Sequence, residues 1–155
     1  LSSAASDVYK RQEIGSTVIY SRLIEGEFVK YNHILPSAFE NVVTVNKDAL
    51  LSSIERAAIV ARNDRFNVVK FEIKENVINI SAKSEIGNVN ENVNINLSGK
   101  DMTIAFNGKY ITDYLKIAGV EFININLNSP IDPCVITPVG KEDFLYLVLP
   151  VRING

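Results

Sequence analysis

The stretch TVNKDALLSSIERAAIVARN, from Thr44 to Asn63, decides the fold because it is the one long helical pattern in the chain. At about 100° per residue its apolar side chains share one arc, and they are Leu50, Leu51, Ile54, Ala57, Ala58 and Ala61. Ser52 and Arg56 fall outside that arc. Asn46 is placed to cap the helix, because its side-chain oxygen can accept the free N–H groups of the first turn. The pattern predicts an amphipathic helix that lies on a sheet.

Two neighbouring residues of this helix, Ile59 and Val60, project outside the apolar arc. Large aliphatic side chains away from the core face indicate a second buried surface. Two explanations remain open at this point. The residues belong to a seam between subunits, or loop residues of the same domain cover them.

Length and composition limit the class of protein to which the chain can belong. The chain has 155 residues, of which 46% are apolar and 22% charged, and it contains no apolar run long enough to span a bilayer. It is therefore expected to be a soluble chain of about one domain with a real core. The net charge of -2 argues against tight nucleic-acid binding. It does not exclude a protein that surrounds DNA without binding it tightly. The single cysteine, Cys134, predicts a buried inert thiol and a reducing compartment.

The first residues of the chain differ in character from the rest. Residues 2–12, SSAASDVYKRQ, resemble the translation of a transposase sequencing adapter, so residues 1–12 are expected to lie outside the fold. A β-rich segment from Thr17 to Ile24 precedes a turn at Glu25-Gly26. Residues 13–40 are interpreted as the closing hairpin of a preceding domain and its connector. Residues 41–153 then form a further domain with a tail at 154–155, and the chain is expected to be the C-terminal fragment of a longer protein.

From residue 42 onward, strand and helix patterns alternate in a regular order. Strands are predicted at residues 42–44, 67–73, 77–82, 92–97, 102–106, 122–127, 134–137 and 144–149. The second helix is predicted at 109–118, with Gly119 as its C-cap. The chain thus spells βαβββ twice. A duplicated unit of this kind predicts an α+β domain with two sheets and with both helices side by side on one face.

Five segments carry a family resemblance, and they are GEFVKYNHILP (26–36), SIERAAIVAR (53–62), FNGKYITDYL (106–115), NSPIDPCVI (128–136) and YLVLPVRI (146–153). In this order and at these separations they resemble the bacterial DNA polymerase III beta subunit, the sliding clamp. The resemblance implies a DNA-clamp fold. It also implies a cytoplasmic, non-catalytic processivity factor without cofactors, in which two subunits form a head-to-tail ring around duplex DNA. The helices would line the opening of that ring.

The resemblance further implies a hydrophobic cleft that holds short linear motifs of the replicative polymerase, the clamp loader and repair proteins. The matching positions are Val29, His33, Ile34, Tyr110, Ile131, Pro133, Leu147, Leu149, Pro150, Val151 and Arg152. Val29 and His33 depart from the proline and arginine that are frequent in the family. The apolar side chains would take the anchors of a peptide, and a few polar groups would orient it.

Two further surfaces follow from the resemblance. The face toward DNA would be sparsely positive and polar, and its residues would be Ser52, Arg56, Lys109 and Lys116. A sparse face suits a sliding ring, because each phosphate that is neutralised strengthens the binding of DNA. Ile59, Val60, Glu85 and Glu91 match the seam with the neighbouring subunit.

Two other classes of function remain as alternatives to the clamp. A small α+β enzyme or ligand-binding domain would use a pocket around Tyr110 and Tyr146 with Asp113 as its acid. Turnover that disappears on Asp113→Asn would favour that alternative. A purely structural interaction module would lack the polar helix face that tracks DNA.

Overall fold

The computed structural model describes residues 9–23, 26, 30–62, 67–141 and 144–153. The chain divides into two compact units, residues 1–31 and residues 32–155. Among the residues that the structure describes, no helix is long and apolar enough to cross a membrane.

The first unit contains an antiparallel hairpin of β1 (Tyr9–Ile14) and β2 (Thr17–Arg22). Gly15 opens its two-residue turn with a φ of 60°, a conformation that glycine adopts without steric cost. Residues 9–12, which were expected to lie outside the fold, pair through their backbone with β2 within this first unit. β2 pairs with the residues before it. The strand expected after Glu25-Gly26 falls on residues 27–29, which lie outside the described ranges.

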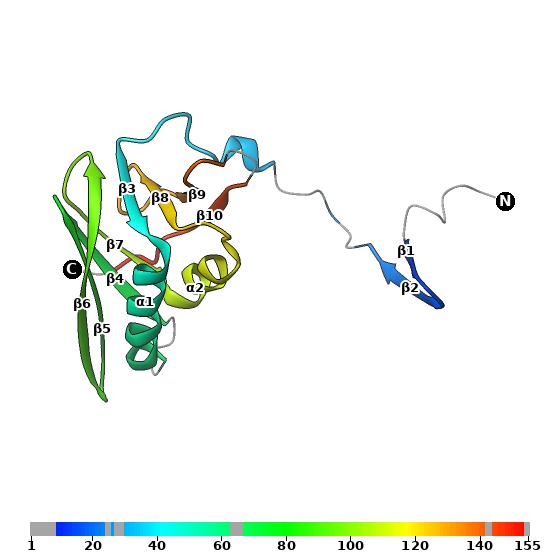
Figure 1. The fold of residues 1–155 in the computed structure, drawn as a ribbon, viewed down its shortest axis with the longest axis horizontal. Helices are drawn as coiled ribbons and strands as arrows, with labels where there is room; N and C mark the ends of the chain where they lie inside the picture. The colour runs from blue at the N-terminus through cyan, green and yellow to red at the C-terminus, as the bar shows by residue number, and fades with distance from the viewer. Residues whose placement is uncertain (1–8, 24–25, 27–29, 63–66, 142–143, 154–155) are drawn as a thin grey trace. The chain divides into compact units, whose positions relative to one another are not determined.

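In its described residues the second unit has two α-helices and eight strands after a short 3₁₀ turn, η2 (Tyr31–His33) (Figure 1). The first half comprises β3 (Asn41–Asn46), α1 (Lys47–Ala61), β4 (Val68–Lys74), β5 (Val77–Ser84) and β6 (Gly87–Ser98). The second half comprises β7 (Met102–Asn107), α2 (Gly108–Ile117), β8 (Phe122–Leu127), β9 (Cys134–Pro138) and β10 (Tyr146–Val148). The predicted order βαβββ-βαβββ and the α+β class are confirmed.

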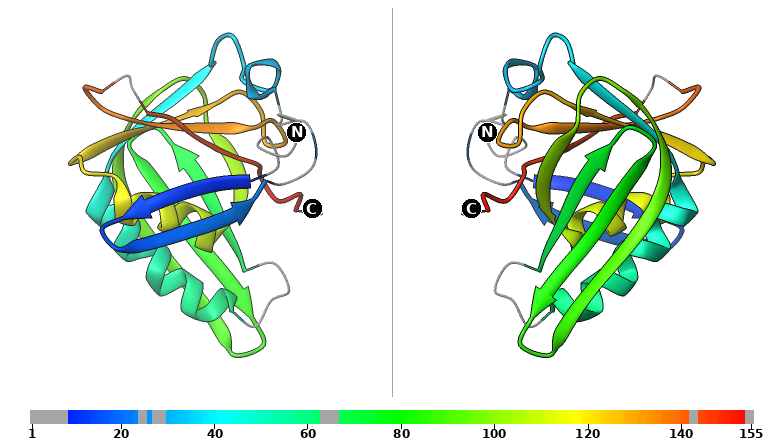
Figure 2. Two further views of the ribbon diagram at one scale, coloured as in Figure 1. Left: turned by 90° about the vertical axis from the view of Figure 1, so that its right-hand side faces the viewer. Right: turned by 90° about the vertical axis from the view of Figure 1, so that its left-hand side faces the viewer.

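The strands form one curled antiparallel sheet in the order β10-β9-β8-β3-β6-β5-β4-β7. β6 joins the part of the sheet that ends in β3 to the part that begins with β5, because residues 87–94 of β6 pair with β5 whereas residues 95–98 pair with β3. The two predicted sheets are thus continuous through β6. Both helices lie side by side on the same side of this sheet (Figures 1 and 2). At the far end, the N–H of Val151 donates to the carbonyl of Ala105 in β7 at 2.8 Å, so the chain end is tied to the other edge of the sheet.

The two halves repeat each other in detail. Asn46 and Asn107 each cap a helix, and their side chains accept the N–H of Asp48 and Ala49 in the first case and of Lys109 in the second. The buried residues of the two halves match in pairs, and the pairs are Val43 and Ile104, Val45 and Phe106, Leu50 and Ile111, Ile54 and Leu115, and Ala57 and Ala118. The same local solution to helix initiation and core packing is therefore used twice.

The start of each helix is also bonded to the other half of the domain. The N–H of Lys47 donates to the carbonyl of Glu121, just before β8, at 2.9 Å. The N–H of Gly108 donates to the carbonyl of Asn67, just before β4, at 3.0 Å. Because each bond joins a helix of one half to a strand entry of the other, neither half completes its backbone hydrogen bonding alone.

The core lies between the helices and the sheet. Leu50 and Ile54 of α1 are fully buried, and Phe71 packs edge to face against Phe106 with ring centroids 5.3 Å apart. Full burial of each such side chain contributes about 1.5–3 kcal/mol. Cys134 is buried as predicted, and burial raises the pKa of its thiol.

Three local predictions differ from the structure. β6 begins at Gly87 rather than at residue 92, and its inward-facing row includes Glu91, whose charge interrupts the apolar pattern. Gly119 is not a left-handed cap, because its φ is not positive. α2 ends at Ile117, and its C-cap residue Ala118 has an extended conformation and packs into the core. β10 spans only Tyr146–Val148 instead of 144–149.

Candidate functional site

A groove runs between α1 and α2 on the face away from the sheet. Its lining mixes acidic, basic and small side chains, and the residues are Glu55, Ala58, Ile59, Arg62, Asn67, Lys109, Thr112, Asp113 and Lys116. Lys109 and Lys116, both predicted to face DNA, meet here. The groove also contains Glu55 and Asp113, which the prediction of a positive face did not include.

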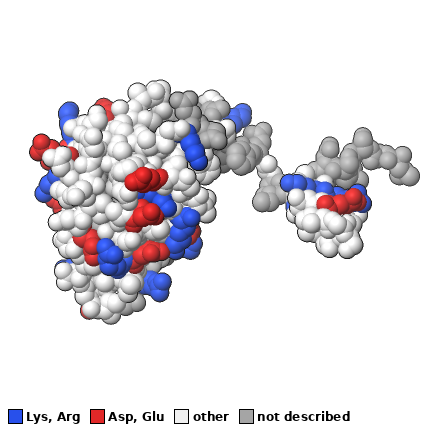
Figure 3. Space-filling view, in the orientation of Figure 1, with Lys and Arg blue, Asp and Glu red and all other residues white. Residues whose placement is uncertain are grey.

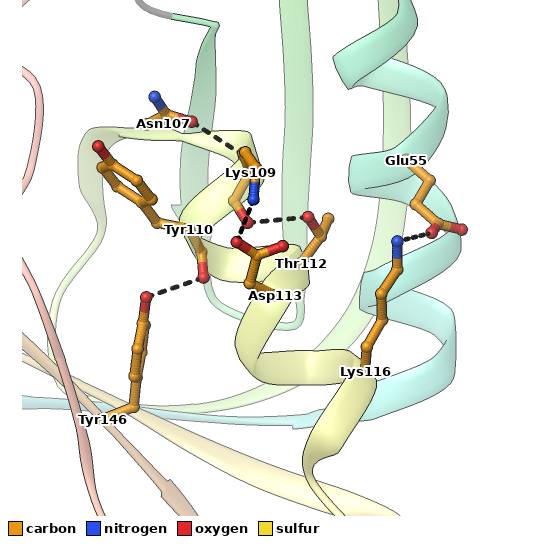
Figure 4. A network of polar contacts seen from close by, with 8 residues as sticks. All are labelled: Glu55, Asn107, Lys109, Tyr110, Thr112, Asp113, Lys116 and Tyr146. Carbon is orange, nitrogen blue, oxygen red and sulfur yellow. Dashed lines mark hydrogen bonds and ion pairs between the residues drawn. The ribbon is translucent and has the colours of Figure 1, made fainter. Parts of the chain in front are cut away.

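Both lysines of this groove are engaged in ion pairs (Figure 4). Lys116 Nζ lies 3.0 Å from Glu55 Oε1, so the pair connects α2 to α1. Lys109 pairs with Asp113 one turn further along α2. This hydrogen bond with Asp113 raises the pKa of Lys109, whose ordinary value already keeps the amine charged at neutral pH. At both lysines the groove therefore presents paired charges of both signs.

Ser52 and Arg56, the other two residues predicted to face DNA, lie on a different flank of α1. They line a depression between α1 and β6 together with Glu91. Arg56 donates from Nε to Glu91 Oε1 and from Nη2 to Glu91 Oε2, both at 2.8 Å, and Nη2 also donates to Ser53 Oγ at 3.2 Å. This two-pronged bond lowers the pKa of Glu91 and raises that of Arg56. The structure therefore separates the four residues into two pairs.

The C-terminal edge of the domain forms a second candidate surface. Tyr146 donates its hydroxyl to the carbonyl of Tyr110 at 3.0 Å, and burial raises the pKa of this phenol (Figure 4). The Val151 bond to β7 fixes the following residues close to the start of α2. Val148 pairs with Cys134 in this antiparallel arrangement, so the residue after Val148 faces the residue before Cys134. Leu149 is thereby set near Pro133.

Apolar side chains at this edge remain accessible to solvent. Leu149 is 64% exposed, Ile131 63% and Tyr110 52%, and Ile34 is also exposed. Leu147, Pro133, Pro150 and Val151 are half-buried, whereas His33 and Arg152 are exposed. The side chains of all these predicted cleft residues thus keep accessible surface; Val29 lies outside the described residues.

Asn128 was missed by the sequence analysis, yet it holds the segment that carries His33 and Ile34. Its side-chain nitrogen donates to the carbonyl of Ala38 at 2.9 Å, and its oxygen accepts the N–H of Glu40 at 2.8 Å. The segment before β3 is thereby attached to the β8–β9 loop. The second unit begins at Asn32, whereas the domain start was expected at residue 41, and these bonds attach part of the intervening segment to it. The only sequence signal of this role is the position of Asn128 between a predicted strand and a loop that contains prolines.

The residues predicted for a subunit seam have different environments. Ile59 is 60% exposed at the α1–α2 groove, and Glu85 is exposed in the turn between β5 and β6. Val60, in contrast, is partly buried and packs against the core, so its predicted projection away from the core is wrong. The buried arc of α1 is wider than its apolar residues suggest, because Ser53 beside Val60 is also buried. Glu91 is engaged by Arg56.

The duplicated βαβββ unit, with both helices on one side of a curled sheet, defines a DNA-clamp domain. A family model described as the C-terminal domain of the DNA polymerase III beta subunit matches residues 32–152, which begin where the second unit begins. The chain belongs to this family of bacterial sliding clamps.

Individual relatives agree with this assignment. The beta sliding clamp of Synechocystis sp. is 30% identical over 143 residues, which cover 91% of this chain and 37% of that protein. The beta sliding clamp of Streptococcus pneumoniae (TIGR4) is 36% identical over 138 residues, which cover 87% of this chain and 36% of that protein. The crystal structure of the DNA polymerase III beta subunit of Thermotoga maritima is 33% identical with a TM-score of 0.81, over 94% of this chain and 42% of that one. The chain therefore spans less than half the length of these relatives.

Proposed function

We propose that this chain contributes the third domain of a DNA polymerase processivity factor. In the whole protein, two subunits form a ring around duplex DNA without reading its sequence. The ring tethers the replicative polymerase, the clamp loader and repair proteins, and the chemistry belongs to those partners. The protein would act in the cytoplasm. Residues 13–40 would be the end of the preceding domain and its connector, of which residues 32–40 pack with the second unit. Family membership and the clamp fold support it.

The observation that carries the proposal is the accessible apolar edge at the C-terminus. Leu149 and Tyr110 expose more than half of their side chains although two hydrogen bonds hold their backbone segments in place. Exposed apolar groups on a fixed backbone suit a peptide ligand, because little conformational freedom is lost on binding. Interfaces between a protein and a short peptide are small, so we expect a dissociation constant of about 1 μM.

The test is binding of a labelled short peptide with leucine and phenylalanine anchors, measured by fluorescence anisotropy. Leu149→Ala is expected to weaken binding roughly tenfold, because a leucine side chain that becomes buried against the bound peptide contributes about 1.5–3 kcal/mol. A point substitution is preferable to deletion of residues 149–152, because deletion also removes the Val151 bond to β7.

Ile86→Ala is the matched control, since Ile86 is also 64% exposed but lies in the β5–β6 turn. It is expected to leave the affinity unchanged. Equal affinities of the wild-type chain and the Leu149→Ala variant would contradict the cleft.

We also propose that Ile59, Val60, Glu85 and Glu91 lie at the seam of the complete ring. In this chain alone, Val60 is half-buried and Glu91 is paired with Arg56, which leaves Ile59 as the exposed apolar side chain of the four. A stable interface needs about 1,000 Å² or more of buried surface. The chain is therefore expected to sediment as a monomer, and a stable two-subunit species would contradict this expectation.

A further inference from the structure

The three helix cations predicted to face DNA share one property: each has an acidic partner within the domain. Lys116 pairs with Glu55, Lys109 with Asp113, and Arg56 with Glu91. Figure 3 shows positive and negative side chains interspersed over the face that carries the helices. A surface selected only to attract DNA would leave its cations free of nearby carboxylates.

The three pairs differ in how easily a phosphate can replace the carboxylate. The two lysine pairs lie at the surface, since the side chains of Lys116 and Glu55 are 56% and 49% exposed, and each is a single-point contact. Exposed single-point pairs of this kind are weak and easily exchanged. Arg56 instead makes two parallel bonds to Glu91, whose side chain is only 26% exposed. Arg56 is therefore a tether between α1 and β6, and the lysines are the exchangeable cations.

We propose that Glu55 and Asp113 compete with DNA phosphates for Lys116 and Lys109, and so limit how strongly the helix face holds the duplex. This inference rests on the proposed function, because only there does DNA lie against the helices. The partner is the phosphodiester backbone of double-stranded DNA.

The physical effect follows from counterion release. Each phosphate that a cation neutralises steepens the dependence of affinity on salt by about 0.9 in a logarithmic plot. A lysine that must first leave its carboxylate gains less from the phosphate, because one ion pair replaces another. The two acids thus keep the number of firm phosphate contacts low while the lysines remain charged. A ring that slides needs this combination.

The experiment compares Glu55→Gln and Asp113→Asn with the wild-type chain. Binding of a labelled short duplex is measured by anisotropy over a series of salt concentrations, and circular dichroism verifies the fold of each variant. Each variant is expected to bind more tightly at low salt. Each should also lose roughly threefold more affinity than the wild type between about 50 and 200 mM salt, as one additional phosphate contact requires.

Glu72→Gln is the matched control. Glu72 pairs with Lys74 at 2.7 Å on β4, so its substitution removes an equivalent negative charge away from the helices. This control is expected to leave the salt dependence unchanged. If Glu55→Gln and Asp113→Asn increase affinity no more than Glu72→Gln does, the competition is refuted, because only net charge then matters.

A separate variant distinguishes this inference from the proposed function. Lys109→Gln combined with Lys116→Gln removes both exchangeable cations and is expected to weaken DNA binding. Weaker binding of this variant without any effect of the acid substitutions would overturn the competition but retain the DNA-facing role. Unchanged binding of the double variant would overturn the DNA-facing role itself, and the competition with it.

Discussion

Gly99→Ala is expected to lower the free energy of unfolding by roughly 3 kcal/mol, which combines backbone strain and steric overlap. Gly99 connects β6 to β7 with a φ of 138°, a conformation that residues with a side chain rarely adopt. An added Cβ would also lie 2.7 Å from the carbonyl oxygen of Glu40 and 2.9 Å from Asn41 Cα. These backbone atoms cannot withdraw cheaply, because the buried Asn41 side chain accepts the N–H of Lys100 at 2.6 Å. Chemical denaturation provides the measurement.

Gly87→Ala separates the two causes. Gly87 has a comparable φ of 147°, but an added Cβ there meets nothing within 4 Å. Its substitution therefore introduces strain without overlap, and a loss of about 1 kcal/mol is expected. If both variants lost the same stability, the close approach of Gly99 to β3 would have no energetic role.

Ile54→Ala and Leu115→Ala are each expected to cost about 2–5 kcal/mol, because both remove buried methyl groups and leave a cavity. These residues occupy matching positions in the two halves, on α1 and α2, and both are fully buried. Similar losses in thermal or chemical unfolding would show that both helices stabilise one cooperative core.

Ile59→Ala is the control on α1, the helix that also carries Ile54, since Ile59 is largely exposed. Its substitution is expected to change the stability by less than about 0.5 kcal/mol. A small loss for Leu115→Ala together with a large loss for Ile54→Ala would contradict a shared core and indicate that α2 docks separately.

Much of the fold could be predicted from the sequence because its signals are local. The apolar arc of α1, the cap at Asn46 and the alternation of the strands each depend on residues close together in the chain. The early start of β6 could not be predicted, since Glu91 occupies an inward position and only Arg56, on a distant element, makes that position tolerable. Local patterns cannot reveal a partner that the tertiary fold supplies.

The same limit explains the candidate site. The cations of the helix face were predicted correctly as exposed helical residues, but their acidic partners come from other turns or other elements. Glu55 lies in the first half of the domain and Lys116 in the second, so their contact depends on how the helices pack. The residues of the cleft were predicted from the family resemblance, and they stay a prediction until a peptide is shown to bind there.

The hydrogen bond from Val151 to β7 has a practical consequence for the design of these measurements. Since the N–H of Val151 is bonded across the sheet to β7, a purification tag or fluorophore attached shortly after Val151 would lie close to Leu149 and Pro150 of the proposed cleft. Labels for binding assays therefore belong on the peptide or DNA, or on an engineered cysteine in the β5–β6 turn.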